Sequence, residues 1–594
     1  MRKSKIIRNN KSSAKVLSAA LFAGCAIVGL GQNVNAQEIY PGVDIPDEVY
    51  KTEYGDNEKY SEIKYYKWDT DSDGAKVLIE GTSTDNDLKY YVSSQKDTIT
   101  DISGVIKDNQ NGGDININFI DLPLDSKTNA IYNAVGNEIG KINTDIVNSG
   151  GNILLNNSGT IDSIDITAIN NSKGIIRSLG TDAKIKNITG TFIGNSNTKG
   201  EALISGNIDS IKGTFIGNKM TGDNAWGTAI STTNTAQAHI GSIKGIFINN
   251  YNNSRGGAIA NGHTMGSIKG IFINNYGKEG SAIWQFGTVD SIEGYFEGNR
   301  GSAAIFAYQR KIIGDAKYNI GSINGIFKDN DVAIYISGQK VGSINGIFIG
   351  NKGAVQNDWG RPTIDSVTGY FEANSKRAIT NGQSATLHNI SGTFINNNLA
   401  NTDSNASGGA IYNTGTLGTI TNSTFTGNYA KTESGIALGG AIYTAKDLQI
   451  VADNHQSVFR GNYTEENGKR DDNAIYANSG AAVNFTVKNN GRIEMYDNIR
   501  GASVEVTETD EDGNEIKYIK NYSVNITGDN TGTFGLYNDI YDANVTIGNT
   551  NLSTVNNLTH TYNFNSLSLT GDVNANVDVD LKNKSMDRLV ADSY

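Results

Sequence analysis

Cysteine and proline are scarce in this sequence. Its 594 residues contain one cysteine, Cys25, and four prolines, against 69 glycines. A single cysteine excludes an intramolecular disulfide framework, so packing and backbone hydrogen bonds must hold the chain together. Helical periodicity is lacking as well, because glycine and asparagine recur every few residues and interrupt every apolar pattern of period 3.6. The sequence therefore predicts an all-β protein.

The first 36 residues differ in composition from the rest of the chain. Six basic residues precede an apolar run over 16–30, and Val34-Asn35-Ala36 is a small-residue cleavage signature. This order is typical of a secretory signal peptide, and the apolar run is shorter than the roughly 20 residues that a membrane-spanning helix needs. We expect residues 1–36, with Cys25, to be removed on export. Phe22-Ala23-Gly24-Cys25 also resembles a lipoprotein cleavage box, and the alternative is lipid attachment at Cys25.

The chain that follows the signal segment is acidic overall. The full sequence carries a net charge of −12, and removal of the six basic residues leaves 44 basic against 62 acidic residues, a net charge of −18. Such a charge repels phosphate backbones. We therefore expect no nucleic-acid partner.

An internal repeat dominates the chain. The eleven residues GSIKGIFINNY occur at 241–251 and again at 266–276. A Phe-x-x-Asn motif recurs at intervals of 21 to 34 residues and is followed in most repeats by Ala and a β-branched residue. Repeats of this length indicate stacked structural units. The motif occurs at Phe192/Asn195, Phe215/Asn218, Phe247/Asn250, Phe272/Asn275, Phe296/Asn299, Phe327/Asn330, Phe348/Asn351, Phe371/Asn374, Phe394/Asn397, Phe425/Asn428 and Phe459/Asn462.

The spacing inside each repeat indicates a strand. Ile243, Gly245 and Phe247 alternate with other residues at period two, and a strand of this length buries a face only when neighbouring repeats stack on it. Stacking would place each Phe over the Phe of the next coil, about 4.8 Å away. The sequence therefore predicts a right-handed parallel β-helix over 113–505, with Ile259 also pointing inward.

The conserved spacing of asparagine within the repeats predicts a second role. We expect Asn250 and Asn275 to lie at the turns, to adopt left-handed backbone and to form a hydrogen-bonded ladder along the stack. The structural interpretation of these Phe and Asn residues is favoured over a binding role.

Segments outside the regular repeats suggest three further regions. Residues 37–112 are expected to form a β-rich cap, and residues 506–594 the C-terminal end of the β-helix or a pre-barrel region. The strand-like sequences Val504–Val506 and Ile516–Tyr518 predict a hairpin. Longer repeats predict extra loops, which in solenoids often carry function. These loops are expected at 222–237, 308–318, 399–407 and 432–438.

One acidic stretch matches a calcium-loop template. Asp69, Asp71, Asp73 and Glu80 stand at the spacing D-x-D-x-D-G-x5-E, whose oxygen ligands suit Ca²⁺. Lys76 and the Gly-Thr-Ser that follows Glu80 do not fit the helices of an EF-hand. The favoured interpretation is a β-hairpin with an acidic turn and no metal, and a calcium-binding turn is the alternative.

Catalytic constellations are not evident in the sequence. Hydrolysis of a glycosidic bond needs two carboxylates that face one cleft, and Asp471-Asp472 are neighbours in a charged turn, where their side chains should diverge. The histidines do not recur at equal positions of the repeat, and we expect each to be solvated. No catalytic residue and no cofactor is therefore assigned. The histidines are His239, His263, His388, His455 and His560.

Pairing of Phe-x-x-Asn with Gly-Gly-Ala-Ile, at 256–259, 408–411 and 439–442, resembles the repeat of autotransporter passengers of the polymorphic membrane protein type. Residues 578–589 are similar to the stretch that precedes the membrane barrel in that family. The resemblance implies a pectin-lyase-like β-helix displayed at the outer membrane or released outside the cell, most often as an adhesin that binds a host or cell-surface protein or glycan. It also implies a barrel in cis or in trans, although no set of barrel strands follows within these 594 residues.

From the sequence we expect a secreted or surface-displayed binding scaffold and not an enzyme. The alternative is a β-helix that acts on polysaccharides as a lyase or glycoside hydrolase, because the same fold hosts both kinds of protein.

Overall fold

The computed structural model describes three strands near the N terminus, two short strands at 115–116 and 119–120, and most of residues 131–593. The gaps in this last range are 134, 137, 151–153, 181, 199, 201, 233–237, 309–315, 510–514 and 557–558. The described residues contain no helix, and their strands stack in parallel as a right-handed β-helix, as predicted. The chain divides into a first unit, residues 1–277 with 293–295, and a second unit, residues 278–292 with 296–594.

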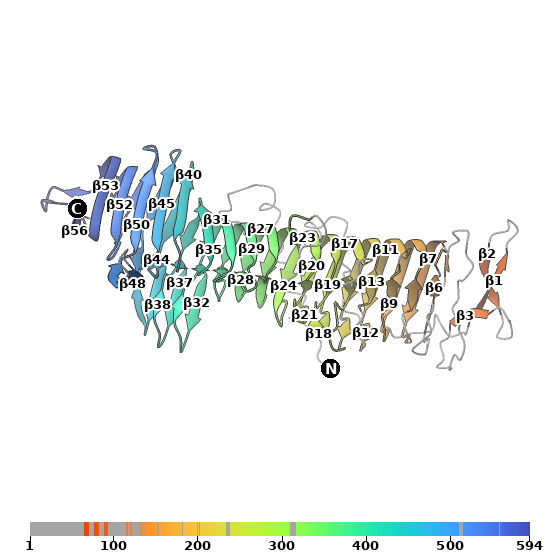
Figure 1. Ribbon diagram of the computed structural model, residues 1–594. Helices are drawn as coiled ribbons and strands as arrows, with labels where there is room; N and C mark the ends of the chain where they lie inside the picture. The colour runs from red at the N-terminus through yellow and green to blue at the C-terminus, as the bar shows by residue number, and fades with distance from the viewer. Residues whose placement is uncertain are drawn as a thin grey trace. The chain divides into compact units, whose positions relative to one another are not determined.

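The first unit has coils built on two main parallel sheets (Figure 1). A short third sheet contains β12 (Ser196–Asn197), β15 (Lys219–Met220) and β18 (Tyr251–Arg255). The long strands are β7 (Glu138–Val147), β9 (Thr160–Ile169), β11 (Lys184–Ile193), β14 (Ile208–Ile216), β17 (His239–Ile248) and β20 (Thr264–Ile273). The short strands are β6 (Ile131–Asn133), β8 (Leu155–Asn157), β10 (Ile176–Ser178), β13 (Ile204–Gly206), β16 (Ile230–Thr232) and β19 (Ile259–Asn261). Strands β4 (Ile115–Asn116) and β5 (Phe119–Ile120) pair with β7.

The second unit repeats the two-sheet plan and then divides its long strands in two. Its unbroken long strands are β25 (Ile320–Lys328), β27 (Lys340–Ile349), β29 (Thr363–Glu372), β31 (Thr386–Ile395), β52 (Asn544–Ser553), β53 (Thr561–Asn576) and β56 (Arg588–Ser593). The divided ones are β35 (Thr416–Thr421) with β36 (Thr424–Thr426), β40 (Leu448–Asp453) with β41 (Gln456–Arg460), β45 (Ala482–Lys488) with β46 (Arg492–Met495), and β50 (Ser523–Gly528) with β51 (Thr533–Leu536).

The second main sheet of this unit is called the short-strand sheet. It contains β22 (Ile283–Gln285), β24 (Ala303–Ala307), β26 (Val332–Ile336), β28 (Gly353–Asn357), β30 (Ile379–Asn381), β34 (Ile411–Asn413), β39 (Ile442–Thr444), β44 (Asn473–Ala477) and β47 (Asn498–Gly501). Its residues alternate between the interior and the outer face, as Ile411, Tyr412 and Asn413 do in β34. Strands β21 (Tyr276–Glu279) and β23 (Thr288–Glu297) contain residues of both units.

Stacked phenylalanines fill the interior, which confirms the predicted packing. Phe247 and Phe272 are register partners, their ring centroids lie 4.7 Å apart, and both rings are fully buried. Ile243 and Ile259 are buried beside them. In the second unit Phe371 stacks on its neighbours in the same way. Burial of each such side chain contributes about 1.5 to 3 kcal/mol.

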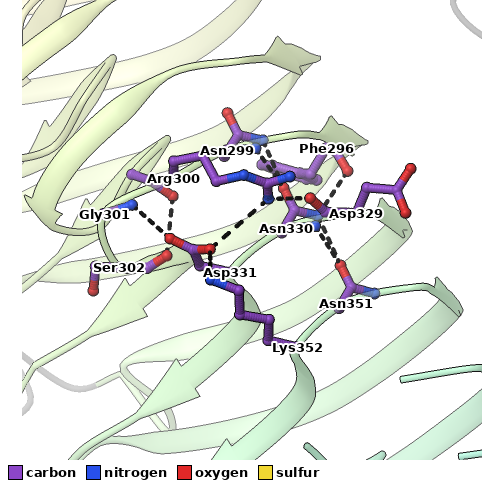
Figure 2. A network of polar contacts seen from close by, with 11 residues as sticks. Phe296, Asn299, Arg300, Gly301, Ser302, Asp329, Asn330, Asp331, Asn351 and Lys352 are labelled. Atoms are coloured by element: carbon purple, nitrogen blue, oxygen red, sulfur yellow. Dashed lines mark hydrogen bonds and ion pairs between the residues drawn. The ribbon is translucent and has the colours of Figure 1, made fainter. Parts of the chain in front are cut away.

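Asparagine ladders satisfy the polar groups of the corners. In the first unit Asn250 Nδ2 donates to Asn275 Oδ1 at 3.0 Å and to the Phe215 carbonyl at 3.0 Å. The ladder of the second unit includes Asn299, Asn330 and Asn351 (Figure 2). These side chains are buried, so each bond avoids the cost of an unpaired polar group.

A second ladder of the second unit lies at the end of the short strands. Asn357, Asn381 and Asn413 donate in turn to the next coil, and Thr444 accepts the last of these bonds. Both corners of these coils are therefore held by internal side-chain hydrogen bonds.

The left-handed backbone does not fall where the sequence predicted it. Asn250 and Asn275 form the ladder, but the positive φ angles belong to the residues before them, Asn249 at 54° and Asn274 at 53°. The prediction was wrong because a ladder side chain must point into the coil, and the preceding residue makes the turn that allows this. The preceding position is Gly in many coils, such as Gly427.

Two predicted loops are strands. Residues 398–407 and 429–438 form β32 (Asn398–Asn401), β33 (Ala406–Ser407), β37 (Tyr429–Thr432) and β38 (Ala437–Leu438), which pair in parallel from one coil to the next. Leu399, Ala406, Ala430 and Ala437 form a small buried cluster between them. Successive insertions of similar length can stack on each other like the coils themselves, and so these segments gain the pairing that an isolated loop lacks. Strand β42 (Tyr463–Glu466) continues the same sheet and forms a hairpin with β43 (Lys469–Asp471).

Two predicted hairpins are confirmed. Strand β48 (Val504–Thr509) pairs antiparallel with β49 (Glu515–Lys520), and β1 (Lys64–Thr70) pairs antiparallel with β2 (Lys76–Gly81). Strand β3 (Leu88–Val92) pairs with the other edge of β1. A smaller hairpin joins β54 (Val579–Asp580) to β55 (Ser585–Met586).

Candidate binding surface

An aligned row of side chains runs along the outer face of the short-strand sheet. We call it the outer column: each member is the residue that follows the inward Ile or Val of a short strand, and each is the register partner of the next. Most members are aromatic. In order they are Trp284, Phe306, Tyr335, Gln356, Thr380, Tyr412, Tyr443, Tyr476 and Arg500.

The equivalent row of the first unit has a different chemistry. Its register partners are Tyr132, Asn156, Arg177, Ser205, Ser231 and Ala260, so one member is aromatic, one is cationic and four are small or polar. The inward-facing packing is the same in both units, and so the core does not require aromatic side chains at the outer position. The outer column is therefore the feature that distinguishes the second unit chemically.

Three tyrosines form the centre of the outer column. The ring centroids of Tyr412 and Tyr443 lie 5.1 Å apart with planes 8° from parallel, and those of Tyr443 and Tyr476 lie 6.1 Å apart at 3°. Asn478 Nδ2 donates to the Tyr443 hydroxyl at 2.8 Å. Burial raises the pKa of Tyr443 and of Tyr476, so both phenols remain protonated donors at neutral pH.

Arg377 lies at one end of the three tyrosines. Its guanidinium carbon is 4.3 Å from the centroid of the Tyr412 ring, and its Nε donates to the Ser407 carbonyl at 2.9 Å. Burial lowers the pKa of Arg377, because a desolvated cation is less stable than one in water. The strand β33, which carries Ser407, thus helps to fix the guanidinium.

Arg500 lies at the other end and is neutralised. Its Nε is 2.9 Å from an oxygen of Asp471, and its guanidinium lies over the Tyr541 ring at 3.9 Å. Burial and, to a smaller extent, the nearby Asp539 carboxylate raise the pKa of Tyr541. Asp539 Oδ1 also lies 2.8 Å from His560 Nε2. The two ends of the tyrosine row therefore differ in charge.

A second aromatic group occupies the earlier coils of the column. Trp284 and Phe286 stack with centroids 5.2 Å apart, and Phe306 lies 5.1 Å from Tyr335. Burial, with a smaller contribution from Asp358, raises the pKa of Tyr335 to about 12. The Trp284 ring is buried, whereas Phe286, Phe306 and Tyr335 are half-buried.

The carboxylates that the sequence offered for catalysis diverge as expected. Asp471 pairs with Arg500, whereas Asp472 pairs with Arg470 at 3.2 Å. The structure adds a contact that the sequence did not indicate, between His388 Nδ1 and Asp365 Oδ1 at 3.3 Å, and Asp365 also accepts from the Tyr318 hydroxyl. His388 is half exposed. The five histidines lie on separate strands and turns and form no common cluster in the described part of the chain.

The structure describes two of the four residues of the predicted calcium site. Asp69 and Glu80 belong to the strands of the β1–β2 hairpin, whereas Asp71 and Asp73 lie outside the described residues. The hairpin backbone agrees with the favoured interpretation, and calcium binding stays a prediction. Within the described residues, no group of three or more His, Cys, Asp or Glu side chains could hold a metal ion.

The sequence contains a signal for the outer column that the repeat search did not use. The residue after Ala-Ile is aromatic in seven coils: Tyr132, Trp284, Phe306, Tyr335, Tyr412, Tyr443 and Tyr476. Because the Ile points inward, the next residue of a strand must point outward. No comparable signal marked Arg377, whose partners come from other coils.

Comparison with protein-family models, curated proteins and solved structures gives no match. A search of the described residues finds no helix with the length and hydrophobicity needed to cross a bilayer.

Proposed function

We propose that the protein is an exported, adhesin-like binding scaffold and that the outer column is its ligand-binding surface. The single observation that carries this proposal is that six of the nine members of the outer column are aromatic and that several of them stack from coil to coil, whereas Tyr132 is the one aromatic member among the six equivalent residues of the first unit. Aromatic side chains and arginine are enriched at the energetically dominant positions of binding surfaces.

Export and surface display are part of the same proposal. They are supported by the basic and apolar start of the chain and by the absence of cysteine after residue 25. The likeness of the repeat to autotransporter passengers supports the same location. The alternative of a polysaccharide-active enzyme is less favoured because Asp471 and Asp472 are each engaged by an arginine.

A substitution that copies another coil tests the binding surface. Tyr412→Thr places in the outer column the residue that Thr380 supplies one coil earlier, so the fold should accept it. The full exported chain would be screened by surface plasmon resonance against glycans and extracellular proteins. We expect Tyr412→Thr to weaken the ligand that is found by at least tenfold.

Tyr429→Thr is the matched control, because Tyr429 stacks on Tyr463 at 5.1 Å in a different sheet. Equal loss in both variants, or no loss in either, would contradict a role for the outer column. Turnover of a glycan by the purified chain, abolished by Asp471→Asn, would favour the enzyme alternative.

A further inference from the structure

We propose that Arg377 binds the carboxylate of an acidic sugar, and that the glycan carrying this sugar extends along Tyr412, Tyr443 and Tyr476. The inference rests on the proposed binding function and specifies the ligand class of that same surface. Three observations support it: the contacts of the Arg377 side chain, the backbone conformation of Arg377, and its position beside Tyr412.

Arg377 is a partly buried cation without a carboxylate partner among the described residues. Its polar contact there is the bond from Nε to the Ser407 carbonyl, and its two Nη groups donate to no described acceptor. Three other arginines of the second unit, Arg470, Arg492 and Arg500, each lie within 3.2 Å of a carboxylate oxygen, whereas Arg460 lies over the Tyr496 ring at 3.9 Å. A desolvated guanidinium without a counter-ion is costly in an otherwise acidic protein, and an incoming anion would remove that cost.

The backbone at Arg377 is strained. Its φ angle is +77°, a conformation that side chains with a Cβ rarely adopt. At the corner before the short strand, other coils of the second unit have a positive φ at a glycine three residues before the inward Ile, for example Gly280, Gly408 and Gly439, whereas Arg377 stands two residues before Ile379. Those coils therefore turn at a glycine, and here an arginine adopts the left-handed conformation instead. Strain of this kind is concentrated at functional sites.

The geometry of the guanidinium selects a planar anion. Nε and the Tyr412 ring hold the guanidinium in place, which leaves the Nη groups to donate two parallel hydrogen bonds to a carboxylate. A neutral sugar would leave this charge uncompensated. A carboxylate is therefore the group that we expect at Arg377.

The tyrosines favour a carbohydrate over a peptide for the remainder of the ligand. Their rings stack on one another, so their faces are covered; Tyr412 and Tyr476 are half-buried, whereas Tyr443 is buried and its hydroxyl accepts from Asn478. The ring edges and hydroxyls of Tyr412 and Tyr476 are therefore the parts that can form hydrogen bonds to the hydroxyls of an extended sugar chain. A peptide would require free backbone donors and acceptors, which this sheet uses between its own strands.

Binding of the full exported chain to four immobilised probes tests the inference. The probes are hyaluronan, hyaluronan with its carboxylates reduced to alcohols, a glycan that ends in sialic acid, and its asialo counterpart. We expect binding to hyaluronan or to the sialylated glycan, at least tenfold weaker binding to the matching uncharged probe, and weakening by added salt. Preference for the first probe indicates uronates within the chain, and preference for the third indicates a terminal acidic sugar.

Three variants separate recognition from folding. Arg377→Gly removes the guanidinium and relieves the backbone, so it should reduce binding at least tenfold without lowering the melting temperature. Arg377→Lys keeps the charge but not the paired donors, and we expect an intermediate loss. Arg470→Gln is the control, because Arg470 also stacks on a tyrosine, at 4.0 Å, but already pairs with Asp472.

Each contrary outcome has a distinct meaning. Equal binding to charged and uncharged probes, no binding to any of the four, or an unchanged affinity of Arg377→Gly would overturn the inference. The proposed function would survive these results if the chain bound another ligand that Tyr412→Thr weakened, and it would fail only if no ligand depended on the outer column.

Discussion

Asn397 Nδ2 donates to Asn428 Oδ1 at 3.0 Å, and the two residues belong to adjacent coils 31 positions apart in the sequence. Asn397 Oδ1 in turn accepts from the backbone and side-chain nitrogens of Asn374. One buried side chain therefore joins three coils, which explains why the repeat retains asparagine while the neighbouring surface residues vary.

Removal of this amide should destabilise the second unit. Asn397→Ala removes the acceptor of the Asn374 backbone and side-chain nitrogens and the donor to the Phe371 carbonyl, and it leaves Asn428 Oδ1 with the bond from the backbone N–H of residue 397 alone; we expect a loss of roughly 2 to 5 kcal/mol in unfolding free energy. Urea denaturation followed by circular dichroism would measure it. Asn398→Ala, one position further on the surface, should cost less than about 0.5 kcal/mol; equal losses in the two variants would contradict the ladder's role.

Gly369, two residues before the stacked Phe371, should not tolerate a side chain. A Cβ at Gly369 would lie 2.2 Å from the Gly346 carbonyl oxygen, closer than any real contact, so the strands would have to separate. We expect Gly369→Ala to cost about 1 to 3 kcal/mol, or more if the backbone cannot shift. The thermal unfolding temperature would report the loss.

Gly353→Ala is the control for this prediction. Its Cβ would meet the flexible Gln356 side chain at 3.1 Å, which can move away. If Gly369→Ala melted at the wild-type temperature, the close stacking of the coils would be wrong.

Asp497 replaces asparagine at the end of the ladder and should make stability depend on pH. Burial raises the pKa of Asp497, although N–H groups of Asn462 and Gly461 oppose the shift. A proton on Asp497 therefore stabilises the folded state, fully below the ordinary value of about 3.9, and this contribution is lost as pH rises through the raised pKa. Relative to Asp497→Asn, the wild type should lose unfolding free energy between about pH 4 and pH 7.

Asp529 should give the opposite slope. Hydrogen bonds, first from the Asn489 N–H and then from Thr531, lower the pKa of Asp529. Its ionised form stabilises the fold above the ordinary pKa, and that stabilisation is lost as pH falls. Denaturant midpoints of wild type, Asp497→Asn and Asp529→Asn at several pH values would check both signs. Parallel profiles for the three proteins would contradict the assignment.

Phe371 should be among the most costly positions to truncate. Its ring is fully buried between Phe348, at 4.8 Å, and Phe394, at 4.7 Å. Phe371→Ala should cost about 3 to 5 kcal/mol, because neighbouring coils held by their own hydrogen bonds cannot collapse into the cavity. Tyr370→Ala, on the outer face of the same strand, should cost clearly less in the same denaturation assay.

The repeat made the packing of the interior predictable from the sequence. The contacts of the outer side chains could not be predicted in the same way. Phe247 and Asn250 recur because every coil presents the same packing problem, so their roles follow from period alone. The sequence predicts loops at 399–407 and 432–438, and not the strands that the structure has there, because pairing between insertions depends on two coils at once. Likewise Arg377 acquires its meaning from Ser407 and Tyr412, which are 30 and 35 residues away.

Ion pairs on the coil surface could likewise be predicted only in part from the sequence. Lys352 Nζ lies 2.7 Å from Asp331 on the preceding coil, and this pair and the Gly301 N–H lower the pKa of Asp331 although burial opposes the shift (Figure 2). Asp331 and Lys352 occupy the same position of the repeat, immediately after a ladder asparagine. Their charges differ from coil to coil, so the sequence period indicates the position but not the pairing.

Disulfide trapping tests the stacked, in-register coils most directly. In a Cys25→Ser background, cysteines replace Thr368 and Ser391, which are register partners in β29 and β31, and mild oxidation is followed by mass spectrometry of the linked peptides. The structure predicts efficient formation of this disulfide, since parallel neighbours lie about 4.8 Å apart, within the range that a disulfide spans. Cysteines at Thr368 and Thr393, two residues out of register, should remain unlinked. Linkage of the second pair in preference to the first would contradict the stacked β-helix.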